Sequence, residues 1–194
     1  LKMQVSGSQN SRMVMMRSQP YAPADGWVVA ERGQVGVVRE GDYHVEWLGG
    51  DRPARGAAVR YDRVKVGAAE REALLAAMRN PRNRVIVNQG GPARGAPDAR
   101  PPEPSAEEMD WPEYMPPFSS RAVLPAPGNR LWVLRSQPAK ATSRVYDVFD
   151  QAGARVAVAS LPATQRVVGF GPGVVFATRT DEDGLQYLMA FRQP

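Results

Sequence analysis

The chain has 194 residues, of which 43% are hydrophobic and 23% are charged. These values are close to the average for soluble globular proteins and exclude a wholly disordered chain. Glycine and proline, 18 of each, exclude a coiled coil because both break helices. The longest apolar runs are far shorter than the roughly 18 residues that span a bilayer. The composition predicts one folded domain, or one and a half.

The positive charge of the chain is almost entirely guanidinium. Lys and Arg together number 25 against 20 for Asp and Glu, and only Lys2, Lys65 and Lys140 are lysine. Arginine suits bidentate pairing with carboxylate or phosphate, which favours an anionic partner such as a membrane surface or an acidic protein face. A bias toward arginine codons explains the same composition. No basic run occurs, and the aromatic residues in strand patterns, Trp27 among them, are expected in the core, so we expect no nucleic-acid binding.

The chain contains no cysteine. This excludes disulfides, thiolate nucleophiles, cysteine zinc sites and covalent c-type haem. The chain begins with Leu1 and shows no signal peptide, as expected for a mature form after cleavage or for a fragment of a longer protein.

Residues 1–25 are mostly polar and are predicted to form an extended N-terminal arm. Their one apolar patch runs from Met13 to Met16, between Arg12 and Arg17. It predicts either a short strand or an anchor into a partner, because methionine adapts to irregular surfaces. Met13, Met15 and Met16 are therefore candidate partner-binding residues.

Residues 26–66 predict a first β-meander, in which short strands are joined by glycine turns. The clearest alternation places Tyr43, Val45 and Trp47 on one face and His44 and Glu46 on the other. The four predicted strands are Gly26–Glu31, Val35–Arg39, Tyr43–Leu48 and Arg60–Val66.

Residues 67–118 predict one short helix followed by a long proline-rich linker. The helix covers 68–79, with acids in its first turn and Arg79 in its last, and it ends before Pro81. Eight prolines between Pro92 and Pro117 favour an extended loop, and a loop of this length is usually functional or disordered. Large apolar residues at its end predict that the linker is held on its own domain or on a partner. These further candidate partner-binding residues are Trp111, Tyr114, Met115 and Phe118.

Residues 119–194 predict two further β blades with a final hairpin turn at 181–184. The seven predicted strands are Ala122–Leu124, Arg130–Arg135, Arg144–Asp150, Arg155–Leu161, Arg166–Gly171, Val174–Thr180 and Leu185–Phe191. The predicted fold class is therefore mainly β: antiparallel sheets in about three propeller-like blades, with one short helix and a long proline-rich loop.

The sequence shows no catalytic, metal or cofactor signature. His44 is the only histidine, and a structural role on a partly exposed strand is expected for it. The glycines from 90 to 95 have phosphate-loop spacing, but Ala96-Pro97 replaces the lysine and hydroxyl residue that the loop needs. The acids at 181–183, which are followed by Gly184, predict the turn of a β-hairpin rather than a calcium site. No catalytic residue, cofactor or metal is predicted.

Two segments carry a resemblance to a known family. One is Gly128-Asn129-Arg130-Leu131-Trp132-Val133 with the hairpin Tyr146–Gly153, and the other runs from Val167 to Tyr187. They resemble the C-terminal blades of bacterial six-bladed β-propeller proteins of the NHL-like type, and the likeness covers about 26–66 and 115–194. The resemblance implies a reduced propeller of about three blades with open sheet edges, and exposed edges invite pairing with another chain. A sandwich or small barrel is the alternative.

These features predict a non-enzymatic scaffold subunit that binds other protein subunits of a membrane complex, with possible contact to the membrane surface. The resemblance implies that it is membrane-extrinsic and periplasmic, in the manner of the small polypeptides of bacterial photosynthetic reaction-centre–light-harvesting complexes. The first alternative is a truncated propeller enzyme or ligand-binding protein. The second is an anion-binding or nucleic-acid-binding module.

Overall fold

The protein is described by a computed structural model that covers all residues except 1, 7–12, 18, 50–52, 80–105 and 193–194. The chain divides into two compact units. The helical unit comprises Leu1–Pro20 and Val66–Pro112, and the β unit comprises Tyr21–Lys65 and Glu113–Pro194. In the described part of the chain, no helix is long and apolar enough to cross a membrane.

The helical unit contains a two-stranded hairpin and one α-helix. Strand β1 (Lys2–Ser6) pairs antiparallel with β2 (Met13–Arg17), so the apolar patch at 13–16 forms a strand, one of its two predicted alternatives. Helix α1 (Ala68–Arg79) has the predicted bounds. Its first turn is stabilised by Glu70, whose Oε2 accepts the backbone N–H of Gly67 at 3.0 Å.

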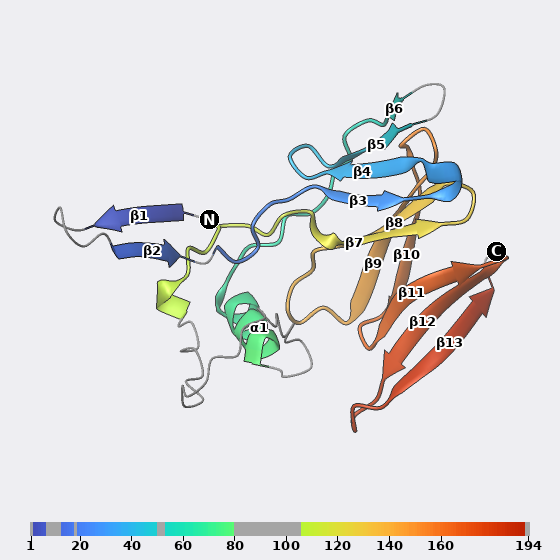
Figure 1. The fold of residues 1–194 in the computed structure, drawn as a ribbon. Helices are drawn as coiled ribbons and strands as arrows, with labels where there is room; N and C mark the ends of the chain where they lie inside the picture. Colours follow the sequence, from blue (N-terminus) through green and yellow to red (C-terminus); the bar gives the residue numbers. More distant parts are fainter. Residues whose placement is uncertain (1, 7–12, 18, 50–52, 80–105, 193–194) are drawn as a thin grey trace, which may run out of the picture. The chain divides into compact units, whose positions relative to one another are not determined.

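The β unit contains three antiparallel sheets, each a meander in which neighbouring strands follow one another in the chain (Figure 1). The mainly β prediction is thus confirmed, and none of the sheets closes into a barrel. The first sheet comprises β3 (Gly26–Val29), β4 (Val35–Arg39), β5 (His44–Leu48) and β6 (Ala54–Arg55). The second comprises β7 (Phe118–Ala126), β8 (Arg130–Arg135), β9 (Ser143–Phe149) and β10 (Arg155–Pro162). The third comprises β11 (Gln165–Gly171), β12 (Val174–Thr180) and β13 (Gln186–Arg192).

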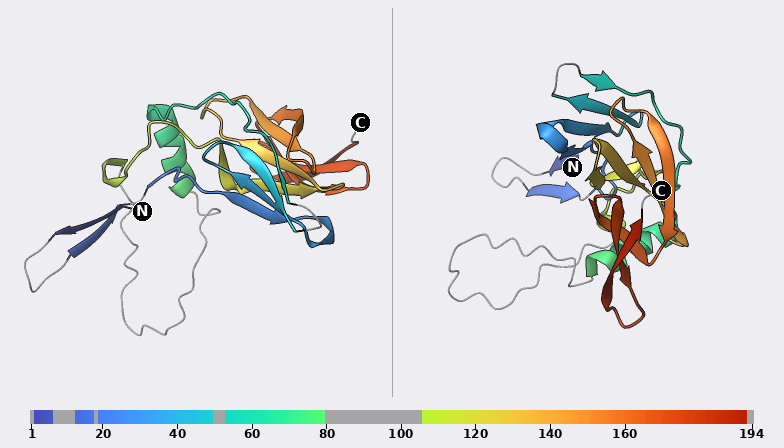
Figure 2. Two further views of the ribbon diagram at one scale, coloured as in Figure 1. Left: turned by 90° about the horizontal axis from the view of Figure 1, so that it is seen from above. Right: turned by 90° about the vertical axis from the view of Figure 1, so that its right-hand side faces the viewer.

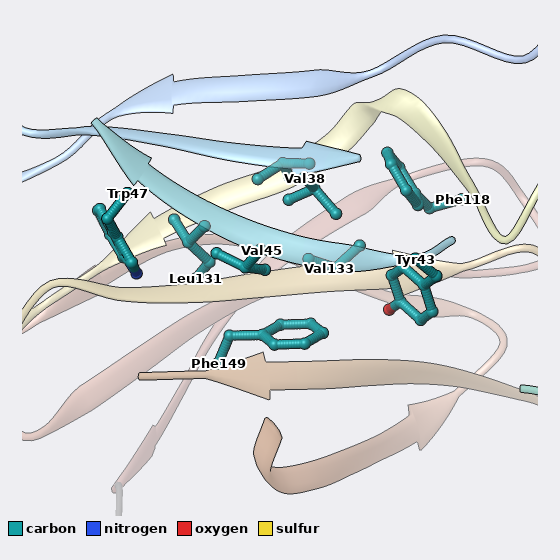
Figure 3. Close-up of a cluster of buried hydrophobic side chains, with 9 residues drawn as sticks. Val38, Tyr43, Val45, Trp47, Phe118, Leu131, Val133 and Phe149 are labelled. Carbon is teal, nitrogen blue, oxygen red and sulfur yellow. The ribbon is translucent and has the colours of Figure 1, made fainter. Parts of the chain in front are cut away.

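The second sheet is the central layer of the β unit (Figure 2), because side chains on the two faces of β8 and β9 enter two different cores. Alternate residues of β8 point to opposite sides: Leu131 and Val133 enter a first core, whereas Trp132 enters a second. The first core lies against β4 and β5 (Figure 3) and includes Val38, Tyr43, Val45, Trp47 and Phe149. The second core lies against the third sheet and includes Tyr146, Val148, Val167 and Val175. Two-sided burial explains why β8 is continuously apolar from Leu131 to Leu134.

One predicted strand is wrong. Residues 60–66 form no regular strand and contribute only an isolated bridge between Lys65 and Tyr114. The backbone of this segment and its neighbour Val59 makes single hydrogen bonds to different parts of the chain instead of a ladder with one strand. Val59 N–H donates to the Tyr43 carbonyl at 2.8 Å, and the Val64 carbonyl accepts the N–H of Met115 at 2.8 Å. Alternating side chains alone could not reveal that no neighbouring strand is available for a ladder.

Two expectations about burial are also wrong. Trp27, expected in the core, is 67% exposed because it lies on the face of β3 that points away from the first core. His44, expected to be partly exposed, is buried. Its Nδ1 lies 2.5 Å from Asp42 Oδ1 and its Nε2 lies 3.0 Å from Glu46 Oε1, so both ring nitrogens are engaged within one hairpin.

A buried carboxylate joins the first two layers. Asp147 on β9 is fully buried, and its Oδ2 accepts hydrogen bonds from Tyr43 Oη and Arg135 Nε, each at 2.6 Å. Arg135 Nη2 and Arg155 Nη1 donate to Oδ1 at 2.5 and 3.3 Å. The hydrogen bond to Asp147 raises the pKa of Arg135. Burial, followed by the Asp147 charge, raises the pKa of Tyr43 far above its ordinary value.

Tyr43→Phe should change the alkaline stability of the chain. The phenol keeps its proton in the folded state but loses it near pH 10 when unfolded, so the free energy of unfolding should fall as the pH rises above about 10. Denaturant unfolding at several pH values should show a shallower alkaline decline for the variant. At neutral pH the variant should be about 1–3 kcal/mol less stable, because Asp147 loses one donor. Equal alkaline slopes in the two proteins would contradict this prediction.

A close backbone approach joins the β9–β10 turn to the first sheet. Gly153 has φ +75°, and a Cβ there would lie 2.6 Å from the Val45 carbonyl oxygen and 2.9 Å from Gly56 Cα. Gly128, in the β7–β8 turn, has nearly the same φ of +73°, but a Cβ there would meet nothing within 4 Å. An alanine at either position would carry the same backbone strain, but only an alanine at 153 would also clash with neighbouring backbone atoms. Comparing the two substitutions therefore distinguishes strain from crowding.

Gly153→Ala should destabilise the chain clearly more than Gly128→Ala. Both substitutions carry the left-handed strain of about 1–2 kcal/mol, but only the first also forces backbone atoms apart. Denaturant unfolding of the two variants side by side measures the difference. Equal losses of stability would show that the layers do not meet at Gly153 as described.

Candidate functional site

The predicted partner-binding residues fall in both units. Met13, Met15 and Met16 lie on β2 of the helical unit. Trp111, also in the helical unit, donates from Nε1 to the Ala106 carbonyl at 2.8 Å, and the Arg71 guanidinium lies 5.5 Å from its ring centre. Partner binding by these residues stays a prediction.

The other predicted residues are used by the β unit itself. Phe118 is buried in the first core, and Met115, three residues earlier in the chain, is also buried. The centre of the Tyr114 ring lies 3.9 Å from the Arg63 guanidinium. Of the two alternatives for the end of the linker, residues 114–118 are thus held on their own domain. Most of the linker, residues 80–105, lies outside the described residues.

The terminal strand β13 presents an open sheet edge. It pairs with β12 on one side, and no described strand pairs with its other side. Its sequence, Gln-Tyr-Leu-Met-Ala-Phe-Arg, carries neither proline nor any charge before Arg192. Leu188 is 70% exposed, and Tyr187 and Phe191 are also exposed. Natural edge strands are usually short, charged or interrupted, so β13 lacks the common protections against pairing with another chain.

An apolar groove of about 430 Å³ lies between the central and third sheets, and the last two residues of β13 line it. Its lining comes mainly from the second face of β8–β10 and from β12 and β13. On the central sheet, Trp132, Val148 and Ala157 share one cross-strand row. The third sheet contributes Val175 and Phe191. Strand β10 is the edge strand of the central sheet, and most of its residues are exposed.

The groove combines this apolar lining with two cations, and one of its lining residues holds an unpaired donor. The arginines are Arg130 and Arg192. The donor is Trp132 Nε1, which is buried and has no hydrogen-bond partner among the described residues. Buried donors are nearly always paired, and an unpaired one costs about 1–3 kcal/mol. The apolar lining and the two arginines suit an occupant that has apolar side chains and a carboxylate.

The sequence pointed to the edge but not to the groove. The likeness to propeller blades predicted open edges and named Leu185–Phe191 as a strand. The groove depends on how far the third sheet covers the central one, which no local pattern records. In the described part of the chain, no group of three or more His, Asp or Glu residues is placed to hold a metal ion.

No protein-family model matches the chain, and no curated protein or solved structure is significantly similar to it. The propeller resemblance therefore stays a prediction. Function has to be argued from the surfaces of the chain itself.

Trp132→Phe should leave the isolated chain equally stable or make it slightly more stable, because it removes the unpaired buried N–H and keeps most of the ring. Trp47→Phe is the matched control, because Trp47 Nε1 donates to the Asp150 carbonyl at 2.8 Å. It should cost about 1–3 kcal/mol in the free energy of unfolding, measured with denaturant. A larger loss for Trp132→Phe than for Trp47→Phe would contradict this account of the groove.

Proposed function

We propose that this chain is a non-enzymatic scaffold subunit that binds a β-strand of a neighbouring protein along β13. The open edge of β13 carries the proposal. An added strand would gain main-chain hydrogen bonds from the edge, and its alternate side chains would enter the apolar groove beside it.

The chemistry of the bound strand follows from the groove. Side chains that face inward would meet Trp132, Val148 and Ala157, so small or branched apolar residues suit those positions. Near Arg130 and Arg192 a glutamate or aspartate would pair with a cation. We therefore expect an extended strand with alternating apolar residues and an acidic end.

The wider setting of the proposal comes from the resemblance alone. We propose that the neighbouring protein belongs to a membrane complex, with a bacterial photosynthetic reaction-centre–light-harvesting complex as the specific candidate. The chain would then lie outside the bilayer, on the periplasmic side. The β13 edge supports the binding of a strand and has no bearing on the identity of the assembly.

Strand binding can be tested with a synthetic strand-length peptide that has valine at alternate positions and two glutamates at one end. Ala157→Trp fills the groove and should weaken binding by about tenfold or more, a change of about 1.4 kcal/mol. Val156→Trp adds the same side chain to the same strand at a residue that does not line the groove, and it should bind as the parent does. Calorimetry measures affinity, and amide hydrogen exchange reports whether β13 becomes protected.

Each outcome of this experiment bears on the proposal. Protection of β13, loss of binding in Ala157→Trp alone, and weaker binding of a peptide with lysines in place of the glutamates would support it. Equal binding by both tryptophan variants, or no protection of β13, would overturn it. If β13 is protected without peptide and the chain sediments as a dimer, the edge is occupied by a second copy and the scaffold proposal fails.

A further inference from the structure

An arginine-rich basin lies on the other side of the central sheet from the apolar groove. It has a volume of about 560 Å³. It is bordered by the irregular segment 59–63 and by two arginines of the central sheet, Arg135 and Arg155. Both arginines hydrogen-bond Asp147, which faces the first sheet through Tyr43. The groove and the basin therefore lie on opposite faces of β8–β10.

The basin carries more positive charge than its own carboxylates neutralise. Its lining includes four arginines, at positions 60, 63, 135 and 155, and one carboxylate, Asp62. The buried Asp147 contacts two of these arginines, so the four positive and two negative charges leave a net charge of plus two. Asp147 is shared by two guanidiniums, and its contact with Arg155 is long at 3.3 Å. Among the described residues, the Arg60 guanidinium has no ion-pair or hydrogen-bond partner.

Three of the four arginines are held in place before any ligand arrives, and Arg60 alone has a guanidinium without a contact among the described residues. Arg135 is fixed by two hydrogen bonds to the buried Asp147, and Arg155 Nη1 also donates to the Arg60 carbonyl at 3.4 Å. The Arg63 guanidinium stacks 3.9 Å from the centre of the Tyr114 ring, which leaves its N–H edge unused by the ring. Hydrogen bonds from Val59 to Tyr43 and from Met115 to Val64 fix the segment between them. Such preorganisation lowers the entropy lost on binding.

From this geometry we infer that the basin binds a phosphate dianion, either free or as the terminal group of a larger molecule. Guanidinium forks match the oxygens of phosphate, and a dianion balances the net charge of plus two. Pockets that hold small organic ligands have volumes of about 300–1,000 Å³, so the basin has room for a phosphate monoester. The site is independent of strand binding, because neither Trp132 nor β13 takes part in it.

The basin can be tested by calorimetry with inorganic phosphate, glycerol phosphate and succinate as probes. Arg60 and Arg63 are exposed and belong to neither hydrophobic core, so their substitution should not disturb folding. Arg60→Gln and Arg63→Gln should each weaken phosphate binding about tenfold. Arg121→Gln removes the same charge from an exposed position on β7 that does not line the basin, and it should leave the affinity nearly unchanged. Thermal unfolding of the three variants checks that each still folds.

The probes distinguish the sources of the phosphate. Glycerol phosphate binding more tightly than inorganic phosphate identifies a small monoester, whereas retention on phosphatidylcholine vesicles that contain phosphatidic acid, but not on vesicles without it, identifies a lipid headgroup. The inference is overturned if succinate binds as tightly as phosphate, if Arg121→Gln weakens binding as much as Arg60→Gln, or if no probe binds. Because Ala157→Trp should not affect phosphate binding, failure of the strand proposal and failure of this one can be told apart.

Discussion

The fold depends on one sheet being buried on both faces. Strands β8 and β9 supply apolar side chains to two cores at once, so the first and third sheets are held to the same central layer. Burial of apolar area is the main favourable term in folding, and here it is concentrated on these two strands. The first sheet packs on Leu131, Val133 and Phe149, and the third packs on Trp132, Tyr146 and Val148.

The same arrangement accounts for both proposed binding surfaces. On one face the apolar groove lies between the central sheet, chiefly β10, and residues of β12 and β13. On the other face the fully buried Asp147 accepts hydrogen bonds from Arg135 and Arg155, which border the basin. One face thus offers main-chain groups and apolar surface, and the other offers guanidinium groups.

The buried charge of Asp147 holds two arginines of the proposed phosphate site and is itself neutralised by them. A carboxylate in an apolar core is tolerated only when it is paired and hydrogen-bonded, and here Tyr43 and two arginines meet that need. The sequence showed only an acid within a strand and gave no reason to separate it from Asp150 at the strand's end. Its importance arises from partners that lie far away in the chain, above all Tyr43.

The sequence by itself determined the elements: helix 68–79, most strand bounds and the final hairpin, whose Asp181 side chain accepts the Leu185 N–H at 2.8 Å. These follow from local signals, namely alternation, turn residues and helix ends. Only the tertiary structure decided that residues 60–66 lack a ladder, that Trp27 faces outward and His44 inward, and where the groove and the basin lie. Each of these depends on which sheet covers which face, and a period of two residues defines two faces without saying which of them will be covered.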